Sequence, residues 1–485
     1  MSASAVRPNV FRPPPSTKKP GATQVKFVRP SHWLALMSVV VAMTASSLLL
    51  SETHYLVGDP TANAVRFGSL ALLVVMMGFR PRDRVAVRKP RLFDGAAVAF
   101  SVLAFASVLY SADPSTTLLR ATSAALLYLA VFWTLWFYAD VVGGRKITDI
   151  LMVCVAIVFF AGILSVFTST GDAWLSARFR GVLANPNAVG MLTILFMPFA
   201  VVRAMRRKSL INYFLILVML VSVVLSGSRN GVMTTSIAMA FFALRIRAWK
   251  TGVLLAALAA ATYLAMPDYA PAPGISARPI NHILSSDDLA EGGGRVEAWA
   301  VAIPIIKSKI LLGHGFGTED LIFKGMKFRI HRGDYIHNSY LGLTYQLGIV
   351  GSLLVFVPLI GLLIYRLLGH GSRSPQTAAY ETLLFGGLIA AFFESWIYSA
   401  GNAFAFPFWT CVMLLTRAAL GARDPDELPT TPARAAAIVR PPSVRRTPLP
   451  AGTPRNALAP GVSRQVVVQK QQNVRRFDPP PPPKG

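Results

Sequence analysis

The sequence has 485 residues, of which 53% are hydrophobic and 14% charged. Soluble domains carry about 25% charged residues, so this composition excludes an ordinary soluble globular protein and predicts a polytopic membrane protein. The formal net charge is +26, but the basic residues lie in the tails and in short links between apolar runs. No basic face is interleaved with aromatic residues, so we expect no nucleic-acid partner.

Both ends of the chain are rich in proline and basic residues. Residues 1–30 cannot bury a core, so they are predicted to be a disordered cytoplasmic tail without a cleavable signal peptide. Residues 421–485 lack an apolar period and end in PPPPPKG, which predicts a second disordered cytoplasmic tail. Its last prolines would form polyproline II, which either binds a partner or stays a plain solvated tail.

Apolar runs of about 18–22 residues recur between the tails. They predict nine membrane spans within 31–266, a large outer loop at 267–337, and three more spans within 338–420. The fold class is therefore an all-α polytopic membrane protein of about twelve transmembrane helices, with short amphipathic helices in the large loop. The predicted spans, with boundary errors of a few residues, are 33–50, 65–79, 92–110, 121–138, 147–167, 187–205, 209–226, 230–245, 251–266, 338–365, 377–398 and 402–420.

The charged links orient these spans. With the N-terminus in the cytoplasm, every link on the inside is basic, as the positive-inside rule requires. The large loop then lies outside, in the periplasm of a cell that has an outer membrane. The inside links are 80–91, 143–146, 203–208, 245–250 and 365–373.

The predicted outer links contain arginines that break this charge pattern, among them Arg178 and Arg180. Arg180 opens the segment RGVLANPNAVG. Within it, Asn185-Pro186-Asn187 is a turn signal that also starts a helix, with Asn187 able to cap the next span. The motif either only forms a turn and starts a helix, or is also part of a site.

Arg229 lies in another outer link, SGSRNG, at residues 226–231. Its side chain either snorkels to lipid headgroups or binds phosphate through two parallel hydrogen bonds. Under the second reading, Gly227 and Gly231 let a phosphate-sized group approach the backbone.

The large loop includes the segment GGGRVEAW, in which glycines precede Arg295. The residues that follow are predicted to form an interfacial amphipathic helix, with Arg295 above an apolar stripe at 299, 302, 303 and 306. A glycine-rich turn, GHGFG at 313–317, comes next. His282, His314 and His331 are interpreted as ordinary loop residues.

His337 and Asn338 stand at the mouth of the tenth predicted span. The positive helix N-terminus disfavours a cationic imidazole, and a neutral imidazole is what a general base needs. Alternatively, Asn338 or Ser339 caps the span and His337 only faces solvent. Glu394 falls within the predicted span 377–398, where it is either functional, a helix–helix hydrogen-bonding group or the counter-ion of an arginine.

The sequence contains no HExxH, CxxC or Walker motif, so neither a metal nor a cofactor is predicted. Cys154 and Cys411 both lie in apolar runs and are interpreted as core residues. Arginines remain as the groups able to stabilise a diphosphate leaving group.

Taken in order, these motifs resemble the O-antigen ligase and polysaccharide polymerase superfamily over about 33–420. The resemblance rests on NPN before the sixth span, SRNG between the seventh and eighth, GR-x-E-x-W and GHGFG in the large loop, and HNSYLGLTYQLGIVG entering a span. It implies a metal-independent, inverting glycosyltransferase of the bacterial inner membrane, with its active site in the periplasm. The implied partners are an undecaprenyl-diphosphate-linked glycan donor, a glycan or lipid A-core acceptor, membrane lipids, and proteins of polysaccharide export or chain-length control.

The same resemblance assigns roles by position. Arg229 and Arg295 would clamp the diphosphate, and His337 would take the proton of the acceptor hydroxyl. The candidates for substrate binding and positioning are Arg180, Asn187, Asn338 and Glu394.

The motifs leave polymerase and ligase open, while the modest loop and the proline-rich tail favour a polymerase of exopolysaccharide or O-antigen repeats. A twelve-span transporter or flippase is the alternative of another class. It would predict two related six-span halves, which the sequence does not show.

Overall fold

The computed structural model describes seven parts of the chain: 60–76, 92–168, 173–175, 178–248, 295–323, 335–369 and 374–420. All of them belong to one compact unit, Met1–Leu428; the other unit, Pro429–Gly485, lies outside the described residues. Also outside are the predicted N-terminal tail, the predicted spans 33–50 and 251–266, and two of the loop histidines, His282 and His331.

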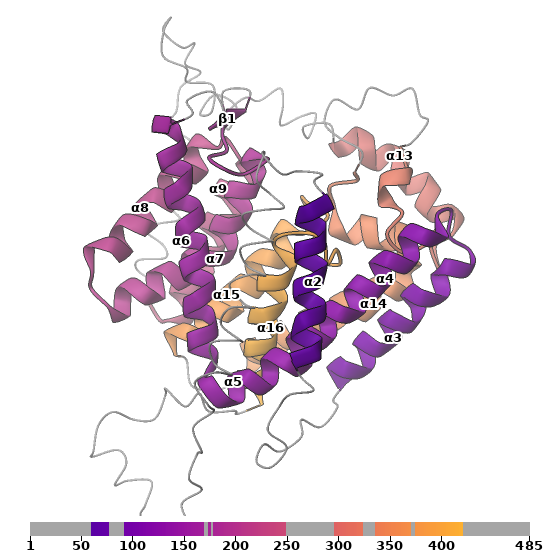
Figure 1. The fold of residues 1–485 in the computed structure, drawn as a ribbon, viewed down its shortest axis with the longest axis horizontal. Helices are drawn as coiled ribbons and strands as arrows, with labels where there is room; N and C mark the ends of the chain where they lie inside the picture. Colours follow the sequence, from indigo (N-terminus) through magenta and orange to yellow (C-terminus); the bar gives the residue numbers. More distant parts are fainter. Residues whose placement is uncertain are drawn as a thin grey trace, which may run out of the picture. The chain divides into compact units, whose positions relative to one another are not determined.

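The described residues are almost entirely helical (Figure 1). One small antiparallel hairpin, which the all-α prediction did not include, pairs Trp174 with Phe179. The helices are α2 (Pro60–Met76), α3 (Leu92–Ala106), η3 (Ser107–Leu109), α4 (Pro114–Tyr128), η4 (Leu129–Leu135), α5 (Trp136–Val142), α6 (Gly144–Thr168), α7 (Pro186–Arg206), α8 (Leu210–Leu225), α9 (Arg229–Arg245), α13 (Arg295–Ser308), η6 (Glu319–Leu321), α14 (Ser339–Leu368), α15 (Pro375–Ala390) and α16 (Ala405–Ala419), and the strands are β1 (Trp174–Leu175) and β2 (Arg178–Phe179).

Several of these helices have the length and composition of membrane spans. In the described parts of the chain, four are long and apolar enough to cross a bilayer: Pro114–Asp140, Gly144–Thr168, Pro186–Arg206 and Ser339–Leu368. Shorter apolar helices accompany them, and α8 exposes Leu210, Phe214 and Leu217 while it buries Leu215 and Met219. An apolar outer face of this kind suits contact with lipid chains rather than water. The predicted number of about twelve spans stays a prediction.

Three helices begin with the same local signal, a capping side chain followed by proline. Asp113 precedes Pro114 and Ser374 precedes Pro375, and each cap accepts a hydrogen bond from a backbone N–H in the first turn. Proline suits the first helical position because a backbone N–H there would have no acceptor within the helix, so nothing is lost when proline lacks it. In α7 the capping residue is therefore Asn185, which accepts from Asn187 N at 2.9 Å; the prediction that Asn187 is the cap is wrong.

Helices α7, α9 and α15 pack against one another at the centre of the unit (Figure 1). Glycines set the spacing between α7 and α9, since a Cβ on Gly231 would lie 2.7 Å from the Gly190 Cα. Small residues let membrane helices approach closely. The structure thus gives Gly231 a role in helix packing, and the predicted access of a phosphate to the backbone stays a prediction.

Helix α14 is broken at Leu347 and Gly348, where the backbone leaves the helical region. The preceding loop supplies replacement partners: His314 N donates to Tyr345 O at 2.8 Å and Gly315 N to Gln346 O at 2.9 Å. Backbone groups released at a helix kink are stable only when such partners exist. The GHGFG turn is therefore fixed to the break in α14.

The ends of the helices differ in charge. At the end opposite the site described below, α7, α9, α14 and α16 each carry arginine in their last turn: Arg206, Arg245, Arg366 and Arg417. Two of these, Arg245 and Arg366, bind the buried carboxylate of Glu381 at 2.6 Å and 3.0 Å. Arg206, Arg245 and Arg366 fall within predicted inside links, whereas Arg417 falls within the predicted span 402–420.

Candidate active site

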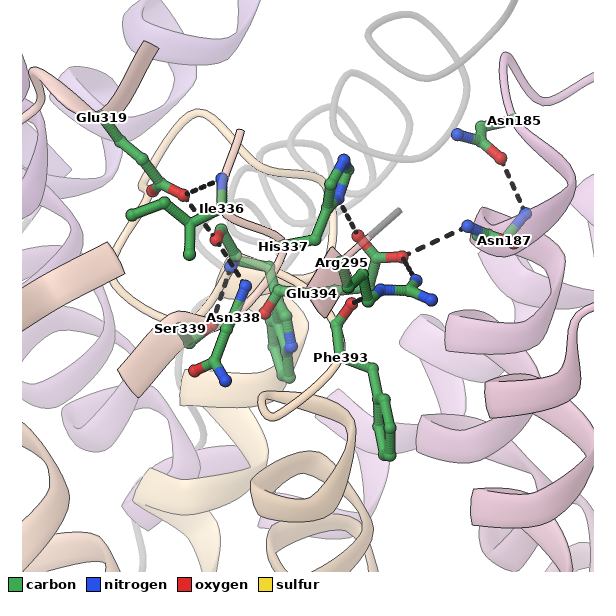
Figure 2. Close-up of polar contacts among 12 residues, drawn as sticks. Asn185, Asn187, Arg295, Glu319, Ile336, His337, Asn338, Ser339, Phe393 and Glu394 are labelled. Carbon is green, nitrogen blue, oxygen red and sulfur yellow. Dashed lines mark hydrogen bonds and ion pairs between the residues drawn. The ribbon is translucent and has the colours of Figure 1, made fainter. Parts of the chain in front are cut away.

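Glu394 lies at the centre of a polar cluster that joins three helix N-termini (Figure 2). The predicted helical span 377–398 is too long, because α15 ends at Ala390 and Glu394 lies beyond it in irregular structure. Just past the helix, Ala391 O accepts from Ser339 N of α14 at 2.7 Å. The Glu394 carboxylate is thereby placed at the mouth of α14.

Arg295 and His337 share this carboxylate. Arg295 Nη2 donates to Glu394 Oε1 at 3.1 Å, and Arg295 Nε donates to Phe393 O at 3.2 Å. His337 Nδ1 lies 3.0 Å from Glu394 Oε2. Arg295 is the first residue of α13, whose Ala298, Ala302 and Ile306 are buried. The predicted helix is present and directs its N-terminus to the cluster, but Ile303 of the predicted apolar stripe is exposed.

Asn187 connects the cluster to α7. Its Nδ2 donates to Glu394 Oε1 at 3.2 Å, and its Oδ1 accepts from Arg178 Nη2 at 2.8 Å. Arg178 Nε also donates to Ser226 O, at 2.8 Å, just before the predicted phosphate-binding link. Arg178, which the sequence had marked only as an outer arginine, is thus tied to the cluster. Arg180 instead turns to Ala184 O, at 3.4 Å.

Arg229 is the first residue of α9 and is half-buried. The cap of α9 is Ser228, whose Oγ accepts from Gly231 N at 3.1 Å. A Cβ on Gly190, one turn into α7, would lie 2.8 Å from the Ser228 Oγ. Arg229 therefore starts its helix beside the first turns of α7, which carry Asn187.

His337 has an unusual backbone, with φ at 52°. An L-residue in this left-handed region costs about 1–2 kcal/mol, so the neighbouring contacts must hold it there. Asn338 is the cap of α14, as one of the sequence alternatives proposed, and accepts from Tyr340 N and Leu341 N at 2.9 Å and 3.1 Å. Strain of this kind concentrates at functional sites.

A comparison with models of protein families gives a match within the chain. Residues 214–356 match the family model described as O-Antigen ligase. This match supports the O-antigen ligase-like superfamily, which the sequence motifs resemble. No curated protein matches the chain. The matched region supports a membrane enzyme that transfers glycans.

The O-antigen ligase match contains Arg229, Arg295 and His337, the three predicted catalytic residues, but not Asn187 or Glu394. In the structure, Glu394 from outside the matched region hydrogen-bonds to Arg295 and His337, and Asn187 hydrogen-bonds to Glu394. In the described parts of the chain, no group of three His, Cys, Asp or Glu is placed to hold a metal ion.

The electrostatics of the cluster favour an ionised carboxylate at Glu394. Burial alone would raise the pKa of Glu394, but the hydrogen bond and charge of His337 and the charge of Arg295 outweigh it and lower that pKa. A carboxylate only accepts hydrogen bonds, so His337 Nδ1 carries the proton towards Glu394. In the neutral ring, Nε2 is then the basic nitrogen.

Glu319 is a second buried carboxyl near His337 that the sequence did not single out. Burial raises its pKa, although hydrogen bonds from Ser395, Tyr398 and Ile336 N oppose the shift. In the sequence it is one of two adjacent acidic residues in GTEDLIF, as expected of a solvated loop. Only the tertiary structure shows it to be 3% exposed.

Proposed function

We propose that this protein transfers a glycan from undecaprenyl diphosphate to an acceptor hydroxyl at the periplasmic face of the bacterial inner membrane. In this proposal its main reaction is the polymerisation of exopolysaccharide or O-antigen repeat units. The observation that carries the proposal is the meeting of several helix N-termini, each with a polar or basic side chain, around the His337–Glu394 pair.

Helices α7, α13 and α14 direct their N-termini to the cluster, and α9 begins beside α7. Each N-terminus carries a partial positive charge and backbone N–H groups, which favour anions. Arg229 and Arg295 add full charges. This combination suits the diphosphate of a lipid-linked donor and stabilises the negative charge that develops as it leaves.

His337 provides the base in this scheme. Its Nε2 takes the proton from the acceptor hydroxyl while the oxygen attacks the anomeric carbon of the donor glycan. The bond from that carbon to the diphosphate breaks, and its electron pair leaves with undecaprenyl diphosphate. Attack from the face opposite the leaving group inverts the configuration. Glu394 holds the imidazole in the required tautomer and stabilises the imidazolium that forms.

An apolar cavity supports a donor with a lipid chain. It lies between α3, η4, α14 and α16 and is walled by aromatic and aliphatic side chains, including Phe93, Phe100, Phe132, Val355 and Trp409. A polyprenyl chain has the matching chemistry, since burial of apolar surface is favourable. The basic helix ends on the side away from the cluster support a cytoplasmic location for that side and a periplasmic one for the cluster.

The proposal is tested in a deletion strain complemented with full-length variants at equal protein levels. We expect Arg229→Ala, Arg295→Ala and His337→Ala each to lower glycan transfer at least 100-fold, because each removes charge stabilisation or the base. The matched control is Arg203→Ala, whose guanidinium is partly exposed and lies 4.0 Å from Asp149 near the opposite end of α7. An exposed pair contributes little, so its transfer should be unchanged. Full transfer by all three site variants would show that the site is wrong.

The description of the matched family favours ligation as the second candidate reaction. The glycans of the deletion strain separate the two. Loss of polymer with single repeats remaining indicates a polymerase. Polymer that accumulates on undecaprenyl diphosphate and is missing from lipid A-core indicates a ligase.

A further inference from the structure

Glu319 has no part in the chemistry proposed above, yet it is a buried carboxyl group in the short helix η6. Burial of such a group is costly unless hydrogen bonds compensate. Its two oxygens accept from four donors on three separate segments of the chain. Such complete bonding indicates that the group organises the structure around it.

One oxygen of Glu319 holds the backbone on both sides of His337. Glu319 Oε1 accepts from Ile336 N at 3.1 Å (Figure 2) and from Ser395 Oγ at 2.6 Å. The same Ser395 Oγ accepts from Asn338 N at 3.0 Å. Glu319 therefore fixes the amide before His337 directly and the amide after it through one serine.

The carbonyl before His337 is held from another element. Ile336 O accepts from Trp299 Nε1 of α13 at 3.0 Å. With its neighbours fixed in this way, His337 keeps a φ of 52° and places Nδ1 3.0 Å from Glu394. Without such contacts the left-handed conformation would relax to a more favourable one, and the imidazole would move away from Glu394.

We propose that Glu319 is a positioning residue of the transfer site. It acts on catalysis through the backbone of His337 and does not contact substrate. The inference rests on the proposed role of His337 as the base.

The other oxygen of Glu319 supplies a matched control. Glu319 Oε2 accepts from Tyr398 Oη and, at 3.3 Å, from Gln346 Nε2. Neither hydrogen bond involves the peptide groups beside His337, although Tyr398 also interacts with the Ser395 side chain. Loss of the Ser395 hydroxyl should therefore disturb His337 more than loss of the Tyr398 hydroxyl, although each removes one hydrogen bond to the same carboxyl group.

The experiment uses full-length protein purified in detergent and, as donor, the lipid-linked glycan extracted from the deletion strain. Initial rates are measured against donor concentration. We expect Glu319→Ala to lower kcat about 100-fold and Ser395→Ala about 10-fold, with the donor KM within about two-fold, because a base displaced by about 1 Å loses rate without loss of binding. Glu319→Gln should keep kcat within about three-fold, because its amide oxygen can replace Oε1. Tyr398→Phe should lose less than Ser395→Ala.

A double variant separates positioning from general loss of structure. Asparagine tolerates the left-handed backbone but cannot serve as the base. In the His337→Asn background, Glu319→Ala should cause no further loss of rate, because its effect requires the imidazole. A further loss of 10-fold or more would overturn the inference.

Other outcomes are equally decisive. If His337→Asn loses rate while Glu319→Ala keeps full rate, this inference alone is overturned. If His337→Asn keeps full rate, the proposed function is overturned, and this inference with it. If Glu319→Ala does not fold, the pair Ser395→Ala and Tyr398→Phe decides. Equal losses in that pair would contradict the proposed role of Oε1.

Discussion

His337 combines a costly backbone conformation with a side chain that shares one carboxylate with an arginine. Its φ of 52° lies in a region where glycine is at ease and other residues are not. The backbone strain at His337 therefore lowers the stability of the folded protein, as is common in active sites. Removing the side chain separates the two effects, because the strain ends only when the Cβ is gone.

We expect His337→Gly to be more stable than His337→Ala by about 1 kcal/mol, while both lose glycan transfer. Both variants lack the imidazole, so the difference reports the backbone alone. Thermal unfolding of the two purified proteins in the same detergent measures it. A lower unfolding temperature for the glycine variant would contradict the left-handed conformation of residue 337.

Sequence reasoning went furthest for residues that stand in short motifs. Arg295 and His337 were singled out from GR-x-E-x-W and HNSY, and the structure brings both to Glu394. Asn185 could also have been recognised as the cap, since proline at residue 186 marks the first helical position. The burial of Glu319 could not have been predicted, because nothing in its local sequence distinguishes a solvated acid from one buried by segments far away in the chain.

At the level of helices, the spacing of α7 and α9 determines where Asn187 and Arg229 stand. The two helices meet at Gly190 and Gly231 with no room for a methyl group. The sequence predicted both helices from their apolar runs, but not this contact, because the composition of one helix does not show which neighbour it packs against. The same holds for the end of α15, which looked apolar through residue 398 but ends at Ala390, beside its contact with α14.

We expect Gly231→Ala to destabilise the protein by about 1–3 kcal/mol, because the added Cβ meets backbone that cannot yield without a helix shift. The same shift would move Arg229 and lower transfer. The control is Gly361→Ala in α14, where an added Cβ meets nothing within 4 Å. Unfolding temperature and transfer are measured for both. Equal behaviour of the two variants would contradict the proposed importance of the α7–α9 spacing.

At the level of the whole molecule, charge separates the two ends of the described unit. The cluster around Glu394 lies at the end where α7 and α14 begin, and arginines occupy the end where these helices finish. The sequence predicted this asymmetry from its basic links. It could not predict which arginines pair, such as Arg417 with Asp140 at 2.6 Å, because the partners are 277 positions apart.

Cysteine labelling tests the resulting orientation. The test uses a variant lacking Cys154 and Cys411 and cells with a permeabilised outer membrane. A membrane-impermeant maleimide added to these cells is expected to label Ala112→Cys. Residue 112 is exposed near the loop that carries Gly315. Lys208→Cys, exposed in the basic link after α7, should be labelled only after the inner membrane is broken. The reverse pattern would contradict the proposed topology.

The position of Glu394 and Asn187 outside the matched region 214–356 has a consequence for engineering. Under the proposed mechanism, this region does not contain the complete site. A chimaera that imports it alone would join the proposed base and arginines of one protein to the carboxylate and amide of another. Grafts intended to alter acceptor choice should therefore carry the first turn of α7 and the segment after α15 together with that region.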